Sequence, residues 1–216
     1  MRFENTSVYN IYNAILGARN PMNSWDKSDS VFKGYNGKIE NTSIGKNDLE
    51  LMQKLVKAGS EHRKFLRQIF VAVDITAPLY FFKELDTYKV GTVANSTSTM
   101  HKLASTPITI DCFEMDDFED CKDDSNVYVS AIWIESITRL EKLRQKYNAT
   151  KDKRYWKELI RLLPESWLQK RTITMNYENI LNMYQQRKNH KLTEWSKSFC
   201  DWVKTLPYAE ELICLE

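Results

Sequence analysis

The most informative segment of the chain reads Arg171-Thr172-Ile173-Thr174-Met175-Asn176-Tyr177-Glu178-Asn179-Ile180-Leu181-Asn182-Met183-Tyr184-Gln185-Gln186-Arg187. A helix that begins at Asn176 and turns by about 100° per residue would bring four polar residues within roughly 60° of one another: Asn176, Asn179, Arg187 and His190. Its adjoining face would carry Tyr177, Ile180, Leu181 and Tyr184. Amide, guanidinium and imidazole groups in one stripe can donate hydrogen bonds to a phosphate or a planar ring. The alternative interpretation is an ordinary solvated helix face, and Asn182 lies off the stripe in either case.

Helical spacing of apolar residues also predicts the elements on both sides of this segment. Apolar positions recur at helical intervals in four stretches, which are residues 127–147, 155–163, 175–186 and 192–203. Pro164 ends the second helix and Pro207 follows the last one, because proline cannot continue a helix. No heptad pattern persists long enough to predict a coiled coil.

The first half of the chain mixes strand and helix signals. Ile69-Phe70-Val71-Ala72-Val73 predicts a buried strand, because it is a short β-branched and aromatic run between polar residues. A helix over residues 79–85 is expected to follow, with Thr76 as its cap and Pro78 in its first turn. Residues 47–66 fit two helices or one broken helix, with the break at Gly59-Ser60.

Residues 1–45 are rich in Asn, Ser and Gly, and they predict a short helix around residues 8–16 followed by a long loop. Together these patterns predict a helix-rich α+β fold with few strands. The length fits a single domain spanning residues 1–216, with residues 1–45 as an irregular N-terminal segment.

The charge balance and the lack of long apolar runs argue against nucleic-acid and membrane partners. The 31 basic and 29 acidic residues nearly cancel, so the chain lacks the cationic field that nucleic-acid binders use, and we expect no nucleic-acid partner. No apolar run approaches the roughly 20 residues of a membrane helix, and the first residues do not resemble a signal peptide. We therefore expect a cytoplasmic protein without a membrane partner.

Metal sites and disulfides are not predicted. The four cysteines form no C-x-x-C pair and have no histidine at zinc-ligand spacing, so we interpret them as reduced thiols. The acidic residues between 116 and 124 lack the alternating spacing and the glycine of a calcium loop, which favours a solvated loop. Motifs of hydrolases, kinases and dinucleotide-binding folds are also missing from the sequence.

Several spaced residues in the last third resemble the flavin-dependent thymidylate synthase family. In that family a Leu-Pro pair precedes T-x-N, a further Asn and an Arg, and here Leu163-Pro164 precedes Thr174, Asn176, Asn182 and Arg187. His190 and Trp195 follow with the family spacing shifted by about one residue. Arg161 resembles the family arginine that reaches the nucleotide phosphate, but it lies one residue closer to the proline.

The first half resembles the same family more loosely. Gly59-Ser60-Glu61-His62 is similar to its G-H segment, which places His62 at a flavin-contacting position. Allowing one inserted residue, the family signature R-H-R-x-x-S-x-N-E-x-S-x-R-Y falls on residues 87–101, where Lys89 keeps a charge and Asn95 and Ser98 match. Four positions depart from the signature, namely Thr87, Tyr88, Ser96 and Met100. The departures remove two arginines that would place flavin and substrate through charge-assisted hydrogen bonds.

The resemblance implies a set of ligands and of residues that hold them. It implies a pyrimidine deoxynucleotide such as dUMP, held by Arg187, Arg161, Ser98 and Lys89. It implies FAD, held by His62, Asn176, Asn182, Asn95 and His190, and it implies folate, NADPH and a homotetramer. The family uses no covalent protein nucleophile, so the resemblance assigns no catalytic residue and no metal. A bacterial or phage origin would suit such a protein.

Three functions remain open from the sequence. A divergent FAD-dependent enzyme would transfer a one-carbon unit from methylenetetrahydrofolate to dUMP, with hydride from reduced flavin. A non-catalytic nucleotide-binding protein would sequester or sense a nucleotide, and the altered signature favours it because both missing arginines lie there. A structural or interaction protein on the same fold is the third hypothesis. The aromatic content of 12% gives it only weak support, because aromatic residues also fill cores.

Overall fold

The computed structural model describes residues 1–35, 38–115, 126 and 128–215. Contacts divide the chain into two compact units, which we name after their main helices, α7 (Tyr177–Arg187) and α5 (Val129–Thr150). The α7 unit comprises Phe3–Asp74, Thr87–Ala94 and Thr172–Glu216, and the α5 unit comprises Met1–Arg2, Ile75–Asp86 and Asn95–Arg171. The single domain over residues 1–216 stays a prediction, and the acidic residues between 116 and 124 lie outside the described residues, as does the loop predicted for them.

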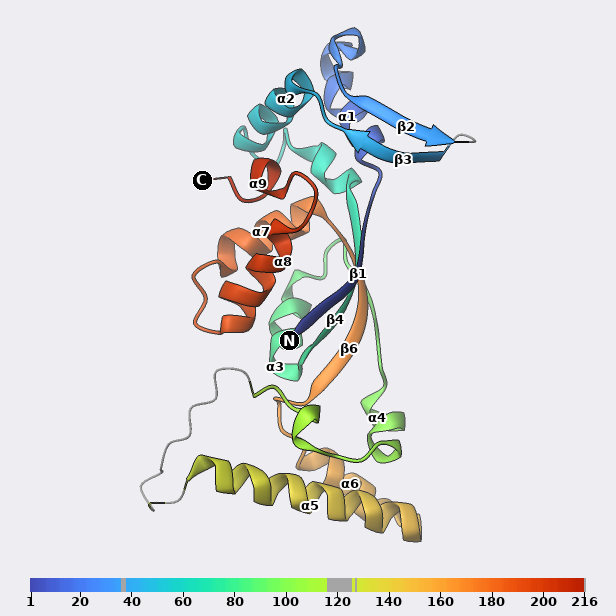
Figure 1. The fold of residues 1–216 in the computed structure, drawn as a ribbon, viewed down its shortest axis with the longest axis vertical. Helices are drawn as coiled ribbons and strands as arrows, with labels where there is room; N and C mark the ends of the chain where they lie inside the picture. Colours follow the sequence, from blue (N-terminus) through green and yellow to red (C-terminus); the bar gives the residue numbers. More distant parts are fainter. Residues whose placement is uncertain (36–37, 116–125, 127, 216) are drawn as a thin grey trace. The chain divides into compact units, whose positions relative to one another are not determined.

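The described strands form two sheets (Figure 1). The larger sheet has the strand order β1-β4-β6-β5, with bounds β1 (Arg2–Tyr9), β4 (Phe70–Pro78), β6 (Leu168–Asn176) and β5 (Val93–Ser96). The smaller sheet is the antiparallel pair of β2 (Val31–Tyr35) and β3 (Lys38–Ser43), in which Val31 faces Ser43. The remaining elements are mostly helical, so the predicted helix-rich α+β fold is confirmed.

Four helical segments precede β5 in addition to the short turns. They are α1 (Ile11–Arg19), α2 (Lys46–Lys57), the 3₁₀ helix η3 (Lys64–Gln68) and α3 (Leu79–Leu85). The second half adds α6 (Lys153–Arg161), the π-helix η7 (Glu194–Phe199), α8 (Cys200–Lys204) and α9 (Ala209–Leu212). Short helical turns complete the order: η1 (Asn20–Met22), η2 (Trp25–Lys27), η4 (Asp86–Tyr88), α4 (Thr99–Lys102), η5 (Leu103–Ser105) and η6 (Ile110–Cys112).

The prediction for the first 45 residues was wrong in two places. Strand β1 occupies residues 2–9, so the helix expected around residues 8–16 starts only at Ile11. Asn10 separates strand from helix with a φ of 71°, a left-handed conformation that asparagine tolerates better than most residues. The predicted long loop contains the β2–β3 hairpin. The sequence of this segment shows no alternation of apolar and polar residues that would have predicted the two strands.

The strand β6 was also missed, and its last residues were assigned to a helix. Ile173 and Met175 are buried, whereas Thr172 and Thr174 are exposed. This alternation is the period-two pattern of a half-buried strand. The helix predicted over residues 175–186 therefore begins two residues later, at Tyr177.

The segment from β4 to α3 follows the prediction except at its junction. The predicted strand is part of β4, and the helix over residues 79–85 is confirmed as α3. Thr76 does not cap this helix, because β4 continues through Pro78. The first helical N–H groups bind backbone carbonyls instead, from Leu79 to Trp167 at 3.1 Å and from Tyr80 to Glu165 at 3.2 Å.

The other helix predictions hold with shifted ends. Residues 47–66 form two helical segments, α2 and η3, so the first of the two alternatives is confirmed. The helices predicted over 127–147 and 155–163 are α5 and α6, and α6 ends before Pro164 as expected. The stretch predicted as one helix over residues 192–203 consists of η7 and α8.

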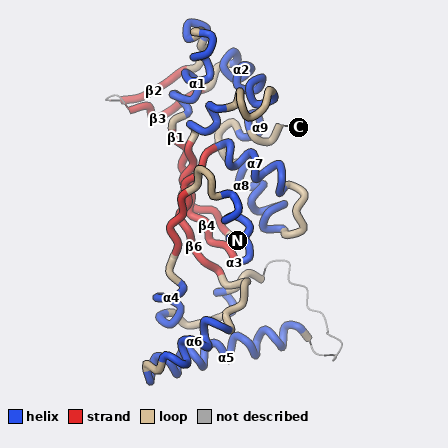
Figure 2. The backbone as a smooth tube through the Cα atoms, turned by 180° about the vertical axis from the view of Figure 1, so that it is seen from behind, coloured by secondary structure: helices blue, strands red, loops and turns tan. Residues whose placement is uncertain are grey.

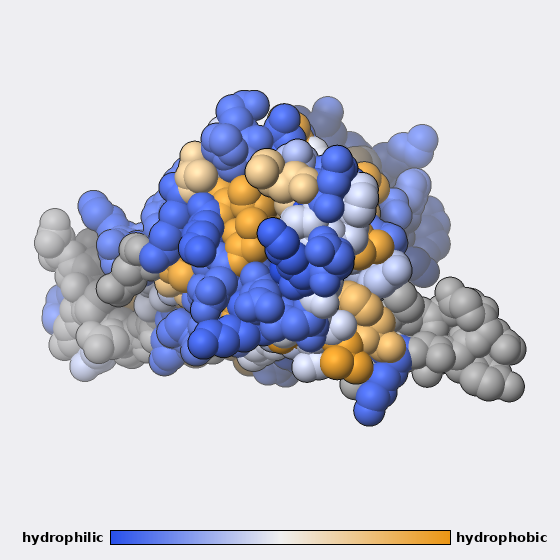
Figure 3. Space-filling view, turned by 90° about the horizontal axis from the view of Figure 1, so that it is seen from above, coloured by the Kyte–Doolittle hydropathy of each residue, from blue (hydrophilic) through white to orange (hydrophobic). Residues whose placement is uncertain are grey.

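Each unit has its own apolar core. In the α7 unit, α7 and α8 lie side by side (Figures 1 and 2), and Trp195 and Phe199 of η7 are fully buried with their ring centroids 5.1 Å apart. In the α5 unit, α5 packs along α6 around a cluster of Leu103, Ile108, Phe113, Leu140 and Leu159. Hydrophilic residues dominate the face drawn in Figure 3 and interrupt its apolar areas. None of the helices in the described ranges is long and apolar enough to cross a membrane.

Candidate functional site

The predicted polar stripe begins at the junction between β6 and α7. Asn176 is the last residue of β6 and the N-cap of α7, with the extended φ and ψ of −122° and 169°. Its side-chain oxygen accepts from the Asn179 backbone N–H at 2.9 Å, and the Asn179 side chain accepts from the Asn176 N–H at 3.1 Å. These two bonds form a capping box, so Asn176 is a cap and not the first residue on the helix face.

The start of the signature region packs against this cap. The Asn179 side-chain amide donates to the Val90 carbonyl at 2.7 Å. Gly91 has a φ of +79°, and a Cβ there would lie 3.1 Å from Nδ2 of Asn176 and 3.3 Å from Oδ1 of Asn179. Because glycine alone combines this backbone conformation with such a close approach, the segment can lie directly on the α7 N-terminus.

Replacing Gly91 with alanine is expected to loosen the first turn of α7. The new methyl group must push against the two asparagines, and the left-handed conformation adds backbone strain of about 1–3 kcal/mol. Hydrogen exchange of the Asn179 amide, which the cap protects, should become faster in Gly91→Ala. Gly59→Ala is the matched control, because Gly59 also has a positive φ, +102°, but no atom lies within 4 Å of its added Cβ. Equal exchange rates of the Asn179 amide in the two variants would contradict the proposed contact.

Arg187 lies at the other end of α7 and contacts two aromatic rings on one side. Its guanidinium carbon is 5.6 Å from the ring centroid of Tyr88 and 5.3 Å from that of Trp195. Its Nε donates to the Tyr88 hydroxyl at 3.0 Å, and that hydroxyl donates to Oε1 of Gln186 at 2.9 Å. Cation–π contact and a hydrogen bond together restrict a side chain that is otherwise flexible.

A network of charged residues surrounds Asn182 in the middle of α7. Glu178 pairs with Arg63 at 3.1 Å and also with Arg67, and Arg63 donates to Oδ1 of Asn182 at 3.1 Å. Burial raises the pKa of Glu178, but the hydrogen bonds from Arg67 and Arg63 outweigh it and leave the pKa below its usual value. Glu178 is therefore ionised, and its two ion pairs link η3 and the turn before it to α7 beside Asn182.

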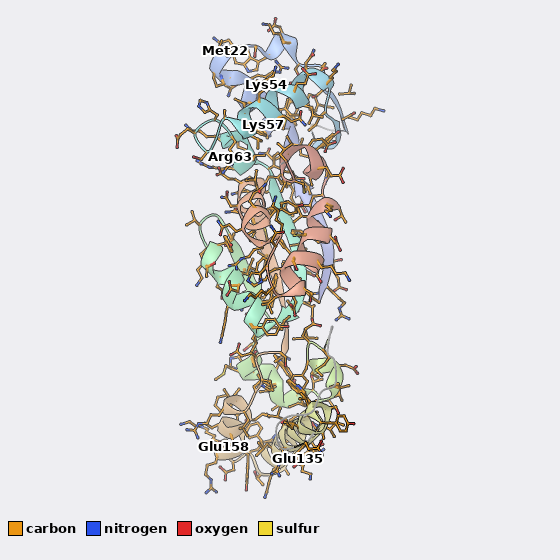
Figure 4. The ribbon with its side chains drawn as sticks, turned by 90° about the vertical axis from the view of Figure 1, so that its left-hand side faces the viewer. Met22, Lys54, Lys57, Arg63, Glu135 and Glu158 are labelled. Atoms are coloured by element: carbon orange, nitrogen blue, oxygen red, sulfur yellow. The ribbon has the colours of Figure 1, made fainter. Side chains whose placement is uncertain are left out.

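Figure 4 labels three basic residues of the neighbouring segment. Lys54 and Lys57 lie on α2, and Arg63 lies in the turn after it.

Three further residues predicted for the site lie in the α7 unit. His62 and Lys89 are exposed, and the His62 backbone N–H binds the Gly59 carbonyl at 3.0 Å in a turn. His190 lies beyond the end of α7, where its Nδ1 accepts from the Leu192 N–H at 3.2 Å. The predicted stripe was wrong at this point, because the helix ends at Arg187 and cannot carry His190 on its face.

The other three predicted residues belong to the α5 unit. Arg161 is 57% exposed at the end of α6 and pairs with Glu158. Ser98 caps α4, where its hydroxyl accepts from the His101 N–H at 3.3 Å, and Asn95 is exposed on β5. The structure therefore places Asn176 and Arg187 at opposite ends of α7, Asn182 within it and His190 in the turn after it. The remaining predicted residues lie on other elements. The binding roles of all of them stay predictions.

Four residues that complete these contacts were not singled out as site residues from the sequence: Arg63, Arg67, Glu178 and Tyr88. Two arginines four residues apart, next to His62, were an available signal for a cationic turn. Tyr88 gave no signal, since its partner is 99 positions away. The described residues contain no group of three or more His, Cys, Asp or Glu that could hold a metal ion.

Comparisons with known proteins give a result only at the level of structure. No family model and no curated protein sequence matches the chain. Two solved structures of the flavin-dependent thymidylate synthase ThyX from Helicobacter pylori, each with FAD and dUMP, are similar to it. The first has a TM-score of 0.69 and 18% sequence identity and covers 100% of both chains. The second has a TM-score of 0.70 and 17% identity and covers 99% of this chain and 97% of the other. This chain thus has the fold of the flavin-dependent thymidylate synthase ThyX.

Proposed function

We propose that this chain binds a pyrimidine deoxynucleotide of the dUMP type together with FAD and acts as a divergent thymidylate-synthase-like enzyme. The observation that carries the proposal is the likeness to ThyX over the full length of both chains, since those structures hold FAD and dUMP. The proposal includes folate as the one-carbon donor, NADPH as the reductant, a homotetramer and a cytoplasmic location. These finer statements extend the resemblance that Asn176, Asn182 and Arg187 carry in the sequence.

Arg187 is the residue that we assign to the nucleotide first. A guanidinium is always charged, and its planar array of donors suits a phosphate or the carbonyl edge of a base. The rings of Tyr88 and Trp195 and the Tyr88 hydroxyl hold this group in one place, so less rotamer freedom is lost when a ligand binds. Lys89, Ser98 and Arg161 would supply further cationic and hydroxyl contacts to the nucleotide.

The chemistry of the donor set beside Asn182 fits FAD. The Asn182 amide, the exposed His62 imidazole and the guanidiniums of Arg63 and Arg67 belong to α7, η3 and the turn before it, and η3 packs against α7. Arg63 and Arg67 both pair with Glu178, and guanidinium groups can donate to the diphosphate of a dinucleotide. Once reduced by NADPH, a bound FAD would supply the hydride, and the residues named here would bind and orient the cofactor. Asn95 and His190 complete the set that the resemblance assigns to FAD.

One observation favours a second candidate, a nucleotide-binding protein without flavin chemistry. Asn176, which the resemblance assigns to FAD, is only 9% exposed, and its side-chain oxygen is engaged by Asn179. The signature region also carries Thr87 and Met100 where the family has arginines, and Met100 is 50% exposed. A protein that keeps Arg187 but holds Asn176 in its own cap could sequester or sense a nucleotide.

Flavin uptake distinguishes the two candidates. Incubation with FAD followed by gel filtration is expected to leave a visible flavin absorption band on the protein, because His62, Arg63, Arg67 and Asn182 offer it a cationic and polar surface. A variant with Asn182→Leu should retain less FAD, and Asn148→Leu, which removes an amide of the α5 unit bonded to the Ala104 carbonyl, should retain as much as wild type.

Thermal unfolding with dUMP completes the experiment. A ligand at 100 times its Kd stabilises the folded state by about 2.7 kcal/mol. If dUMP stabilises the protein but FAD is not retained, the enzyme hypothesis fails and the nucleotide-binding hypothesis is supported. The absence of both effects would overturn both candidates and leave the structural or interaction protein.

A further inference from the structure

The Tyr88 side chain joins the segment of residues 88–91 to the last turn of α7. It lies in η4, at the start of the segment that reaches the α7 N-terminus through Val90 and Gly91. Its hydroxyl meets the last turn of α7, where it accepts from Nε of Arg187 at 3.0 Å and donates to Oε1 of Gln186 at 2.9 Å. The segment from residue 88 to 91 therefore contacts both ends of α7, and Tyr88 makes the contact at the C-terminal end.

The hydrogen bond from Nε contributes to the orientation of the Arg187 guanidinium. One acceptor fixes the direction of the Nε–H bond, and the rings of Tyr88 and Trp195 restrict rotation of the planar group about that bond. The ring of Trp195, which is fully buried, supports the guanidinium at 5.3 Å and cannot move without disturbing the core. The Tyr88 ring lies 6.5 Å from that of Trp195, with an angle of 52° between the ring planes.

The hydroxyl of Tyr88 has a role that its ring alone cannot fill. The ring offers a cation–π contact, which is tolerant of rotation of the guanidinium. The hydroxyl accepts a hydrogen bond from Nε of Arg187 and donates one to Oε1 of Gln186, so a lone pair is directed toward Arg187. A phenylalanine at this position would keep the first contact and lose the second.

We propose that Tyr88 is the positioning residue for Arg187, and that its hydroxyl orients the guanidinium for the pyrimidine nucleotide. This inference rests on the proposed function, because it assigns to Tyr88 a part in the same nucleotide site. It also assigns a role to one of the altered signature positions, because Tyr88 would orient the Arg187 guanidinium on α7.

The test is a cycle of variants whose affinity for dUMP is measured by titration calorimetry. Tyr88→Phe should weaken binding about tenfold, because a hydrogen bond to a charged group is lost. In the Arg187→Ala background the same change should have no further effect, because Tyr88 acts through Arg187. An equal loss in both backgrounds, or no loss in either, overturns the proposal. Tyr9→Phe is the control, since it removes a hydroxyl from a tyrosine that is 55% exposed.

A second measurement needs no ligand. In nitrogen-15 NMR of the arginine side chains, the Nε–H of Arg187 should exchange slowly with water in wild type and in Tyr9→Phe, and faster in Tyr88→Phe. Unchanged exchange in Tyr88→Phe would overturn the proposal, and so would failure of wild type to bind dUMP. In the latter case the proposed function fails as well, and slower exchange in wild type than in Tyr88→Phe would show that Tyr88 holds Arg187 for a purely structural purpose.

Discussion

Replacing Asp48 with alanine is expected to lower the free energy of unfolding by about 3–5 kcal/mol, the usual cost of removing one partner from a buried ion pair. Asp48 and Arg19 are 1% and 4% exposed, and Nε of Arg19 donates to Oδ1 of Asp48 at 2.5 Å. Without Asp48, the guanidinium would stay buried beside an empty space. The loss should be measured by urea unfolding followed by circular dichroism.

The surroundings of Asp48 explain why the effect should be large. Oδ2 accepts hydrogen bonds from the hydroxyls of Ser28 and Ser30, at 2.7 Å and 2.5 Å. Arg19 also donates to the carbonyls of Ser24 and Lys27. One carboxylate thus fixes α1, the segment after it and the first turn of α2, and each of these donors and acceptors would lose its partner or its position.

The same residue gives the prediction a pH dependence. Burial raises the pKa of Asp48, but hydrogen bonds from Ser30, Ser28 and Arg19 outweigh it and leave the pKa below its usual value. A lowered folded-state pKa means that the stabilisation is present above the unfolded pKa of about 3.9 and is lost as the pH falls through the folded value. The difference between wild type and Asp48→Ala should therefore shrink in acid below about pH 4.

Glu50 provides the control on the same helix. Its carboxylate is 51% exposed and lies 3.9 Å from Lys46, so Glu50→Ala should change the free energy of unfolding by less than about 1 kcal/mol. If Asp48→Ala does not fold, Arg19→Lys keeps the charge and loses the planar fork, and a smaller loss should be measurable. An effect of Asp48→Ala or Arg19→Lys no larger than that of Glu50→Ala would refute the importance of the buried pair.

Removing the Arg187 side chain is expected to weaken dUMP binding by about 1.5–3 kcal/mol, or about 10- to 150-fold in Kd. Arg187 is a predicted nucleotide contact whose guanidinium lies beside the rings of Tyr88 and Trp195 and donates to the Tyr88 hydroxyl. Arg187→Ala should remain folded, because the buried rings of Trp195 and Phe199 still pack on each other. Titration calorimetry with dUMP measures the loss of affinity, and circular dichroism tests the fold.

Arg139→Ala is the matched control for Arg187→Ala. Arg139 lies on α5, is 72% exposed and pairs with Glu135, so its loss removes an exposed cation from the α5 unit. Its variant should bind dUMP with the affinity of wild type. Unchanged affinity in Arg187→Ala would remove Arg187 from the nucleotide site and with it the main support for the proposed contacts.

The sequence predicted the helical elements because their signals are local. The apolar period of α3, α5, α6 and α7 repeats within one or two turns, and Pro164 marks the end of a helix without reference to the rest of the chain. Strand β6 had an equally local signal in the alternation of Ile173 and Met175 with polar residues. It was not predicted because Met175 also fits the helical spacing of the residues that follow. Strand β1 and the hairpin carry weaker patterns, since their stability comes from pairing with distant partners.

In the candidate site, the amino-acid sequence alone shows which groups are present: the amides of Asn176 and Asn182, the guanidinium of Arg187 and their spacing along one segment. The contacts of these groups depend on how the whole chain packs. The tertiary structure made Asn176 a cap, bound Asn182 to Arg63 across 119 positions and placed Tyr88 on Arg187 across 99. The physical reason is that a helix period follows from neighbouring residues, whereas a hydrogen bond between distant residues exists only after the whole chain has packed.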